Sequence, residues 1–480
     1  MSSFKPTIPS KPEAFTFVAP GISPEAAKLS EQLLIKSDGF HIFFNDKKFH
    51  NHLNHHLLAA YSFGASTERL QKIFDINASY QRPMPPSIGE ITRENYKQYL
   101  GNADAYTSFL SFFKSEIDHF GITETVRRFV WSNDFLARTV GGLYHPLIHI
   151  GYGLEFNLPG MAAEGLAMAA MTEDHFLPLI PLQPELNKAS IIPSQAQTLA
   201  ENATSSARGY AAKALDQLTN QLATRLGIAD RTATQHYEDS ADRSIPATID
   251  TPDYLKHHSL FAIFNHIRED PALQGLFKST DEVRFKLVLK NEKAVERIRH
   301  YVAQWGLTEN TIVIQKKMKE LYSFVAILAG STALHPNHPG KLRPSFFLVH
   351  ALTSVEFLHQ FVTRIAPSEA VSLIQAHLAI TIVYFLTEGS PKFNLEGLLN
   401  YKSPIQSEKF ENRWFPVMDA SLDQEESHVI KAVRACVVGQ IIYGPHDDSR
   451  LDDIWFKTAE LVVDANGKWD FDGVGFEDTW

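Results

Sequence analysis

Twenty-one histidines occur among the 480 residues, and several lie in apolar segments where a helix would turn them inward. In FHNHLNHHLLAAY, helical periodicity places His56 on the same face as leucines, so its ring is predicted to point into the core. His145 and His149 are four residues apart, a spacing at which two imidazoles can bind one metal ion. His350 lies among phenylalanines in SFFLVHALTSVEF. Three inward histidine faces predict a buried metal centre between helices.

The same residues have a plainer interpretation, because a lone histidine on an apolar face is commonly a core residue bonded to a backbone carbonyl. His52, one turn before His56, either shares the metal or hydrogen-bonds to His56 without binding the metal itself. His377 is a reserve ligand. Imidazole ligands without cysteine suit iron, copper or zinc rather than calcium or magnesium, and they do not choose among the three.

Helices are needed to bring these histidines together, and most of the chain shows the i, i+3, i+4, i+7 spacing of amphipathic helices. Ser23, Pro24 and Glu25 form a helix start, and Gly39 ends the segment that follows. Further helices are predicted at about 47–63, 67–76, 93–99, 103–118, 122–139, 142–156, 160–172, 196–226, 252–266, 280–304, 308–330, 343–363, 367–387, 423–442 and 452–462. Only 40–44 and 460–471 have weak strand character. The predicted fold is mainly α, a large bundle-like single domain with a metal site between inward-facing helices and little or no sheet.

One catalytic domain is expected over residues 21–480, after a polar, proline-broken lead at 1–20 that is disordered or extended. The region 193–250, rich in Ala, Thr, Gln and Ser, is either a helical insertion or the seam between two halves. No signal peptide and no run of about 20 apolar residues is seen, so a cytoplasmic protein without a membrane span is expected. Cys436 cannot form an internal disulfide and is expected to be a small buried side chain.

The charge balance excludes one class of partner. Lys and Arg number 45 against 55 Asp and Glu, a formal net charge of -10. A chain of this sign repels a polyphosphate backbone, so no nucleic-acid partner is expected. A small molecule is the expected partner, and the sequence does not specify an oligomeric state.

Four segments carry a resemblance that extends over about residues 20–460: FHNHLNHHLLAAYSFGAS, GGLYHPLIHIGYGLEF with AEGLAMAAM, SFFLVHALTSVEFL, and FLTEGSPKFN. Together they resemble the questin oxidase-like family of fungal polyketide-tailoring enzymes. The resemblance implies an oxidoreductase that uses O2 to open the ring of an anthraquinone-type polyketide in secondary metabolism. The outcome would be Baeyer–Villiger-like or that of a dioxygenase, and the substrate a small aromatic polyketide.

The resemblance also implies a mononuclear non-haem Fe(2+) held by four histidines and by a lysine carboxylated on its amine. Carried onto this chain, these ligands match His56, His145, His149, His350 and Lys392. A carbamate would supply the anionic oxygen that the histidines lack, whereas a free ammonium cannot bind a cation. The alternative for the lysine is a solvated cation near a helix C-terminus. Three residues near these ligands in sequence are predicted to bond substrate or bound oxygen, with ordinary packing as the alternative: Tyr61, Tyr152 and Thr353.

Three other functions compete with this interpretation. An NADPH-dependent Baeyer–Villiger monooxygenase is one, but no cofactor-binding motif is seen, since Gly151 and Gly153 lie inside a helical pattern without the third glycine of G-x-G-x-x-G. A zinc-dependent hydrolase would use the same histidines and work without O2. A non-catalytic carrier of an aromatic ligand would bind the substrate and retain no iron.

Overall fold

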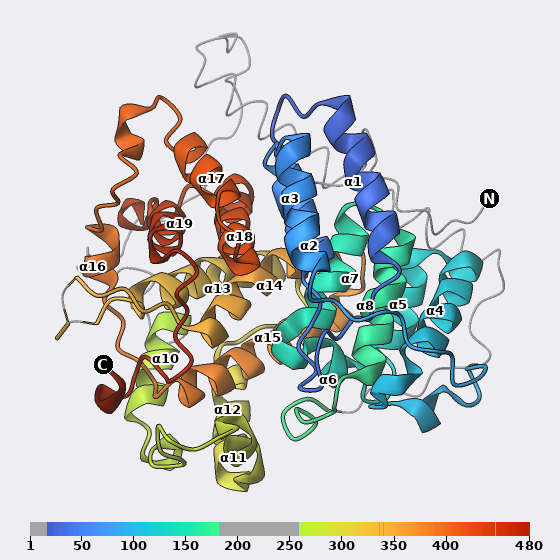
Figure 1. Ribbon diagram of the computed structural model, residues 1–480. Helices are drawn as coiled ribbons and strands as arrows, with labels where there is room; N and C mark the ends of the chain where they lie inside the picture. The colour runs from blue at the N-terminus through green and yellow to red at the C-terminus, as the bar shows by residue number, and fades with distance from the viewer. Residues whose placement is uncertain (1–16, 182–258, 336, 339, 447) are drawn as a thin grey trace, which may run out of the picture. The chain divides into compact units, whose positions relative to one another are not determined.

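Helices supply all the regular secondary structure of the described part of the chain. The structure is a computed structural model that describes residues 17–181 and 259–480, apart from 336, 339 and 447. Up to residue 181 it contains α1 (Pro24–Ser37), α2 (Leu53–Ser62), α3 (Thr67–Ala78), α4 (Tyr106–Phe120), α5 (Ile122–Val130), α6 (Phe135–Val140), α7 (His145–Glu155) and α8 (Pro159–Met171). From residue 259 it contains α10 (Leu260–Glu269), α11 (Arg284–Lys290), α12 (Glu292–Gln304), α13 (Thr311–Ser331), α14 (Phe346–Val362), α15 (Pro367–Thr387), α16 (Leu395–Leu399), α17 (Trp414–Leu422), α18 (Ser427–Tyr443) and α19 (Ile454–Ala465) (Figure 1). No strand forms among these residues, which confirms the predicted mainly helical fold.

Side-chain capping explains where two of these helices begin. α1 starts at Pro24, after Ser23, whose hydroxyl accepts from the amide of Ala26 at 3.1 Å, as the sequence predicted. α14 starts after Ser345, whose hydroxyl accepts from the amide of Leu348 at 3.1 Å. A cap fixes the first turn, and with it the direction in which each later side chain of the helix points.

Several predicted helix boundaries are wrong because the backbone turns where the apolar pattern continues. The helix predicted at 47–63 begins only at Leu53, since the preceding residues form a loop in which Phe43 pairs with His50. The helix predicted at 142–156 begins at His145, because Leu143 and Tyr144 have φ of 55° and 60°. The segment 122–139 is broken between α5 and α6, and 280–304 between α11 and α12.

The strand prediction is also wrong at both places where it was made. Near residue 40 the structure has only isolated bridges, Phe40 with Pro83 and Phe43 with His50. The segment 460–471 continues α19 as far as Ala465 and then makes one bridge, from Asp470 to Ser345. The helix predicted at 196–226, most of the lead at 1–20 and the region 193–250 lie outside the described residues.

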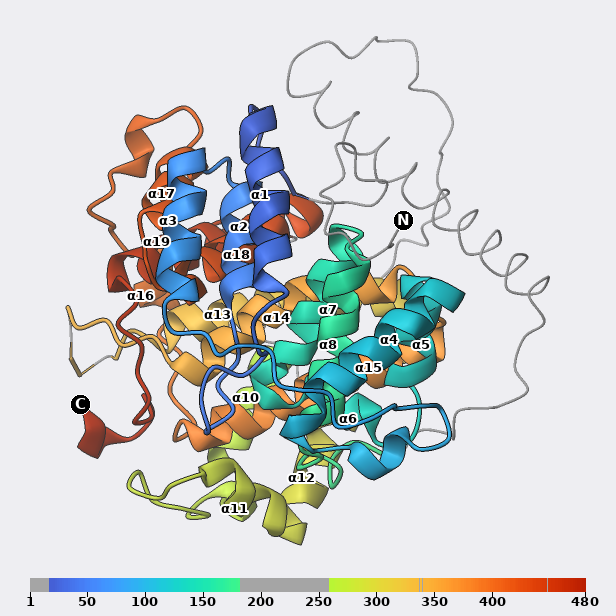
Figure 2. The ribbon, with the colours of Figure 1, turned by 45° about the vertical axis from the view of Figure 1, so that its right-hand side comes forward.

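Four helices pack together at the centre of the described chain. α7 packs against α14, α14 against α18, α18 against α2, and α2 against α7 (Figures 1 and 2). α7 is buried along its whole length between α8 and α14. Two glycines permit this approach, since a Cβ on Gly151 would lie 2.3 Å from Phe357, and one on Gly153 would lie 2.7 Å from the backbone of Ala162.

A buried ion cluster ties these same helices together. Arg434 of α18 is 0% exposed and pairs with Glu155 of α7 at 2.5 Å and with Glu356 of α14. Its Nε also donates to the hydroxyl of Ser62, at the end of α2, at 2.9 Å. Glu155 of α7 therefore has an arginine as its partner.

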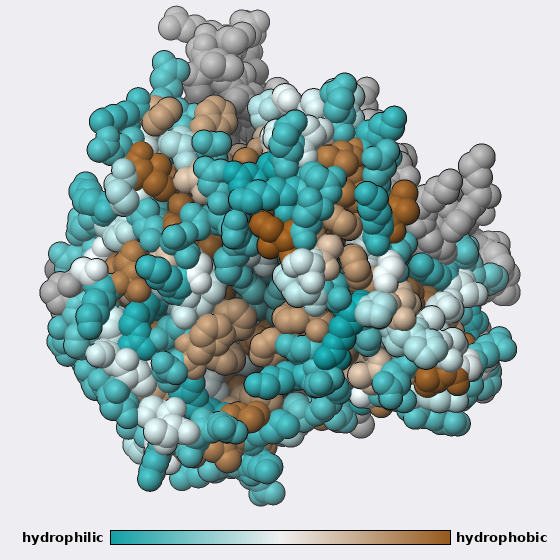
Figure 3. Space-filling view, viewed as in Figure 1, coloured by the Kyte–Doolittle hydropathy of each residue, from teal (hydrophilic) through white to brown (hydrophobic). Residues whose placement is uncertain are grey.

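One helix, α15, is long and apolar enough to cross a membrane by length and composition alone. Of its most apolar window, 83% is buried inside the protein, as in a core helix of the same composition. The face shown in Figure 3 is mainly hydrophilic, with apolar side chains in small groups. This distribution agrees with a chain in which charged residues make up 21% of the sequence.

Candidate metal centre

His145 and His350 are held in one orientation by their own helices. The Nδ1 atom of His145, the first residue of α7, lies 2.7 Å from the carbonyl oxygen of Gly142. The Nδ1 atom of His350 lies 2.6 Å from the carbonyl oxygen of Phe346, one turn earlier in α14. A carbonyl only accepts, so Nδ1 must carry the proton in both rings, and each neutral ring then has a lone pair on Nε2.

His428, near the start of α18, is oriented in the same way by a carboxylate. Its Nδ1 donates to Glu426 at 2.6 Å, and the indole Nε1 of Trp469 donates to the same carboxylate at 2.6 Å. Burial alone would raise the pKa of Glu426, but the charge and hydrogen bond of His428 and the bond from Trp469 lower it to about 2. An ionised Glu426 fixes the Nδ1 proton of His428 and leaves its Nε2 as a third lone pair.

The rings of four histidines meet at these Nε2 atoms. The Nε2 of His52 lies 2.6 Å from that of His145, and the Nε2 of His350 lies 3.1 Å from that of His428. Ligand atoms of His52, His145 and His428 all lie within 4.8 Å of one another. The centroids of the His145 and His350 rings are 4.9 Å apart. The four rings come from the N-terminal ends of α7, α14 and α18 and from the residue before α2.

The chemistry of this donor set fits a cation. Burial, with the charges of neighbouring histidines, lowers the pKa of His52, His145 and His350 well below the ordinary value, and burial lowers that of His428. Neutral rings cannot place a proton between the Nε2 atoms of His350 and His428, because both protons are committed to Nδ1. Two lone pairs would then face each other at 3.1 Å. A metal ion that accepts from both removes this repulsion, so the residues present fit a metal bound by imidazoles.

Lys431 adds an amine to the same site. It lies three residues after His428, on the same face of α18, is 2% exposed, and its Nζ has no hydrogen-bond partner among the described residues. Its charge acts on seven histidines: His50, His52, His55, His56, His145, His350 and His428. Burial lowers the pKa of Lys431 to about 7, partly offset by Glu426. With such a pKa a large share of this amine is neutral near pH 7, and the neutral form is a nucleophile rather than a cation.

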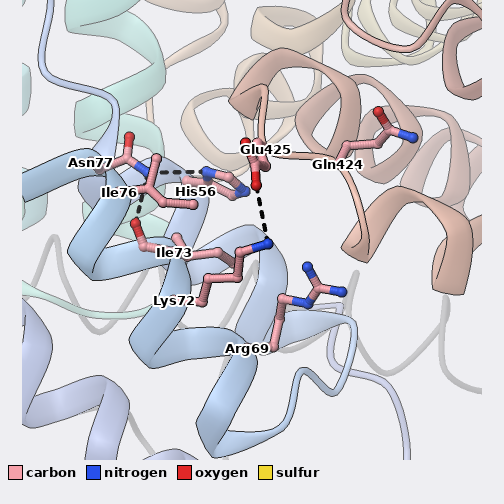
Figure 4. Close-up of a pocket in the computed structure, with 8 residues that line it drawn as sticks. All are labelled: His56, Arg69, Lys72, Ile73, Ile76, Asn77, Gln424 and Glu425. Atoms are coloured by element: carbon pink, nitrogen blue, oxygen red, sulfur yellow. Dashed lines mark hydrogen bonds and ion pairs between the residues drawn. The ribbon is translucent and has the colours of Figure 1, made fainter.

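Of the predicted ligands, the structure brings His145 and His350 into this cluster but turns His56 away from it. The Nδ1 of His56 lies 3.4 Å from the side-chain amide nitrogen of Asn77 in α3, and its Nε2 is buried without a hydrogen-bond partner in the part of the chain that the structure describes. Figure 4 shows His56 among the residues that line a small pocket, together with the ion pair of Lys72 and Glu425, 3.0 Å apart. The pocket is lined by His56, Arg69, Lys72, Ile73, Ile76, Asn77, Gln424 and Glu425. His52 takes the position that the sequence gave to His56, because α2 starts later than predicted.

His149 lies one turn from His145, but both of its nitrogens are engaged elsewhere. Its Nδ1 lies 2.9 Å from the Nε2 of His55, and its Nε2 lies 2.8 Å from Glu164 of α8. Lys392, predicted as the carboxylated lysine, is exposed after the end of α15, so it does not share the buried environment of the histidines. The buried lysine beside them is Lys431.

The three residues predicted to bond substrate or oxygen either contact other side chains or backbone of the protein, or lie on a part of their helix away from the clustered histidines. Thr353 points its hydroxyl at the carbonyl of His350 in its own helix, at 3.4 Å. The ring of Tyr152 stacks on His55, with centroids 5.3 Å apart, and contacts Phe357. Tyr61 is 7% exposed on the far turn of α2. Among these, only Tyr152 lies against a histidine ring.

Two members of the site were missed from the sequence, His428 and Lys431. The signal was present in SHVIKAVRACVVG, where His428, Lys431 and Arg434 recur at a spacing of three residues among apolar side chains. The ring of His50, in the loop before α2, stacks on His145 with centroids 4.1 Å apart. His377, the reserve ligand, is bonded to Ser354 at 2.8 Å instead.

A second group of possible ligands lies far along the chain, in the loop before α14 and near the C-terminus. It comprises His335, His338 and Glu477. The side chain of Glu477 is 64% exposed and pairs with His335 at 3.3 Å. An exposed pair of this kind is adequately explained as a surface ion pair.

Comparison with known proteins assigns the family. A family model described as Questin oxidase-like matches residues 49–436. The chain belongs to the questin oxidase-like family. The matched range contains all four clustered histidines and Lys431, and it confirms the resemblance found in the sequence.

Curated relatives align with this questin oxidase-like chain over nearly its whole length. The Baeyer-Villiger oxidase ptaJ of Pestalotiopsis fici is 26% identical over 97% of this chain and 94% of its own. The Baeyer-Villiger monooxygenase AacuH of Aspergillus aculeatus is 25% identical over 96% and 91%. Questin oxidase of Aspergillus terreus is 24% identical over 92% and 89%. The family therefore makes this protein an oxidoreductase.

Proposed function

We propose that this protein is a non-haem iron-dependent oxygenase that oxidatively cleaves the ring of an anthraquinone-type polyketide in secondary metabolism. The observation that carries the proposal is the convergence of the Nε2 atoms of His52, His145, His350 and His428 inside an oxidoreductase fold. The names of the relatives, questin oxidase and Baeyer-Villiger oxidase, support an oxidation of this class of compound. O2 is the proposed co-substrate.

In this proposal the four clustered histidines hold the iron, in place of the set first expected from the sequence. When bound, iron would supply the redox chemistry with O2 that no protein side chain here can supply. The chain's own contribution is to fix each ring through its Nδ1 partner: Gly142, Phe346 and Glu426 for three of the four. These three rings are thus oriented before a metal enters.

Lys431 replaces Lys392 as the proposed carboxylated lysine. A neutral amine can combine with CO2, and the resulting carbamate would give the all-imidazole set its anionic oxygen. Lys431 supports this role because it is buried, lacks a hydrogen-bond partner among the described residues and has a pKa lowered to about 7. Lys392 is exposed, which supports its alternative as a solvated cation.

Aromatic side chains form one side of the proposed site. Phe346 packs against both His350 and His428, with ring centroids 4.7 and 5.0 Å away. Phe471, from the C-terminal segment, packs on the outer side of Phe346 with centroids 4.5 Å apart and is 55% exposed. A flat aromatic substrate would be received by such a surface, and the same rings would keep water from the histidines.

An NADPH-dependent Baeyer–Villiger monooxygenase is the second candidate, because two relatives are named Baeyer-Villiger monooxygenases. The glycines that might have served a phosphate-binding loop do not support it. Gly151 and Gly153 are used for the close packing of α7 against α14 and α8. The zinc hydrolase and the non-catalytic carrier are disfavoured by the oxidoreductase family.

Metal analysis combined with O2 uptake tests the proposal. Purified protein should contain close to one iron per chain and should consume O2 only when an anthraquinone or hydroquinone substrate is added. His145→Ala should lose both the iron and the O2 uptake. His175→Ala, which changes a half-buried histidine outside the cluster, should keep both. Wild-type protein that turns over without iron, or that carries a flavin spectrum, would overturn the proposal in favour of the second candidate.

A matched pair of lysine variants tests the carbamate. Lys431→Ala should lose activity and recover part of it when a short carboxylate such as acetate is added, because the anion can occupy the vacated volume. Lys392→Ala should behave as wild type in both conditions. If Lys392→Ala loses activity and Lys431→Ala does not, the assignment is reversed.

A further inference from the structure

A chain of hydrogen bonds leads from the histidine cluster towards the surface through residues that the cluster does not use. His55 of α2 contacts His149 of α7 at 2.9 Å, and His149 contacts Glu164 of α8 at 2.8 Å. The carboxyl groups of Glu164 and Asp38 are hydrogen-bonded to each other. Asp38 caps the C-terminal end of α1 and is half-buried, whereas the other three are 5% exposed or less.

The donor and acceptor in each of these hydrogen bonds can be assigned by starting from Glu164. Burial alone would raise the pKa of Glu164, but the hydrogen bond and charge of His149 lower it, so Glu164 is ionised and accepts from Nε2–H of His149. The Nδ1 of His149 is then a lone pair and accepts from Nε2–H of His55. The Nδ1 of His55 is left as a lone pair, buried and without a hydrogen-bond partner among the described residues.

That free lone pair belongs to the ring nearest the cluster. The ring of His55 lies 6.0 Å from that of His52. Burial, with the charges of His149, Lys431, His50 and His428, lowers the pKa of His55 well below its ordinary value, so the ring stays neutral and takes a proton on Nδ1 only as it releases the one on Nε2. His55 is therefore the inner end of a path whose every link is already hydrogen-bonded.

The outer end can exchange a proton with water. Burial and the charge of Glu164 raise the pKa of Asp38 to about 7, against the opposing charge of Lys114 in α4. The two carboxyl groups therefore hold one proton between them near neutral pH. Burial, with the charges of Glu164 and Asp38, also raises the pKa of Tyr106 of α4 well above its ordinary value.

Two further side chains hold Glu164 in place without carrying protons themselves. The amide of Asn54 donates to the Oε2 of Glu164 at 3.2 Å. The hydroxyl of Ser37 in turn donates to the side-chain amide oxygen Oδ1 of Asn54 at 2.5 Å. Glu164 thus receives hydrogen bonds from α2 and α7 at the same oxygen, which fixes it between the histidines and Asp38.

We propose that His55, His149, Glu164 and Asp38 form a proton-transfer path between the buried site and solvent. The proposal rests on the proposed function, which brings a phenolic substrate to the cluster. The O–H bond of the phenol breaks, and its proton goes to the Nδ1 of His55. The Nε2 proton of His55 passes to the Nδ1 of His149, the Nε2 proton of His149 passes to Glu164, and Asp38 releases its proton to water. The same path run inwards returns a proton at the end of the cycle and restores both rings.

Isosteric variants of the two carboxylates test the path in the full-length, metal-loaded protein. Glu164→Gln can still accept from His149 but cannot take up a proton, so kcat should fall by about 10- to 100-fold while KM changes little. In Asp38→Asn the kcat should fall less than in Glu164→Gln, and its dependence on pH near 7 should disappear. Iron content and melting temperature should match the wild type in both variants.

The control is Glu116→Gln, which removes another buried carboxylate, one that pairs with Arg93 at 3.0 Å and lies outside the path. It should retain wild-type kcat. The path is disproved if wild-type protein turns over and Glu164→Gln is as active as Glu116→Gln.

A readout without turnover separates this result from failure of the proposed function. The infrared difference between metal-free wild type and Asp38→Asn should contain a carboxyl band that titrates near pH 7, which separates Asp38 from Glu388, another carboxyl group whose pKa is raised to about 7. The band should persist in Glu116→Gln. Wild-type protein inactive on every quinone and phenol, with this band present, would count against the proposed function alone. Absence of the band would overturn the path whatever the activity.

Discussion

Two buried polar clusters lie on the same three helices, and they differ in whether the protein satisfies them by itself. Six residues separate His350 from Glu356 on α14, and six separate His428 from Arg434 on α18, a rise of about 9 Å along each helix. Near the start of these helices the Nε2 lone pairs of His145, His350 and His428 converge with the Nε2 of His52, and those of His350 and His428 have no proton between them. Further along, Arg434 meets two carboxylates and a hydroxyl. The satisfied cluster holds the helices together, and the unsatisfied one is left for a ligand.

Removing the arginine should have the largest effect on stability. Arg434→Met leaves Glu155 and Glu356 buried without their cation, which is expected to lower the free energy of unfolding by about 3–5 kcal/mol. Denaturant unfolding of metal-free protein measures this loss. Arg413→Met removes an arginine from a partly exposed pair with Asp453 and should cost about 1 kcal/mol or less. Equal losses in the two variants would contradict the division between the clusters.

Removing the metal should have the next largest effect, and only on the first cluster. If the ion is present at about 100 times its Kd, a strong chelator should lower the free energy of unfolding by about 2.7 kcal/mol. His350→Ala should start from the lower stability and show no further change with chelator. Calorimetry with and without chelator measures both values. A wild-type protein indifferent to chelator would mean that the lone pairs are tolerated without a cation.

Glu388, at the end of α15, is a third buried polar group, and its charge is only partly compensated by a cation. It therefore predicts a dependence of stability on pH. Burial raises its pKa from 4.5 to about 7, although Arg284 lies 3.9 Å away and opposes the shift, while Asp470 adds to it. The folded state therefore binds this proton more tightly than the unfolded state. The resulting stability is present below the unfolded pKa and is lost as pH rises to about 7.

Glu388→Gln should remove this decline. Above pH 7 the variant should be more stable than wild type by about 2 kcal/mol, and the difference should disappear towards pH 4. Thermal unfolding across that range gives the comparison. A variant that is less stable than wild type at pH 8 would show that Arg284 neutralises Glu388 as fully as Arg434 neutralises its own partners.

The smallest effect on stability is expected at Thr353, which lies on α14 between His350 of the first cluster and Glu356 of the second. Among the described residues its hydroxyl donates only to the backbone carbonyl of His350, at a long 3.4 Å. Thr353→Val should therefore change the free energy of unfolding by about 1 kcal/mol or less and leave KM unchanged. Steady-state kinetics and unfolding measure the two quantities. A large rise in KM would restore the predicted contact between Thr353 and the substrate.

The sequence predicted the site as three inward histidine faces, and two of its ligand candidates, His145 and His350, lie in the cluster. Their helices have a clear start, a proline after His145 and a serine cap before Phe346, so the direction of each ring follows from the helix. His56 and His149 were chosen by the same reasoning and lie outside the cluster. All ten residues of α2 and all eleven of α7 are buried, so periodicity had no solvent face to exclude.

What the sequence by itself determined is the helical fold, the family and the presence of buried histidines on several helices, because these depend on local pattern and composition. Only the tertiary structure decided which rings meet. His52 enters the cluster because a loop, and not a helix, precedes α2, and Lys431 joins it because α18 packs against both α2 and α14. The direction of a side chain within a fully buried helix is set by its neighbours in space, which are distant in the sequence.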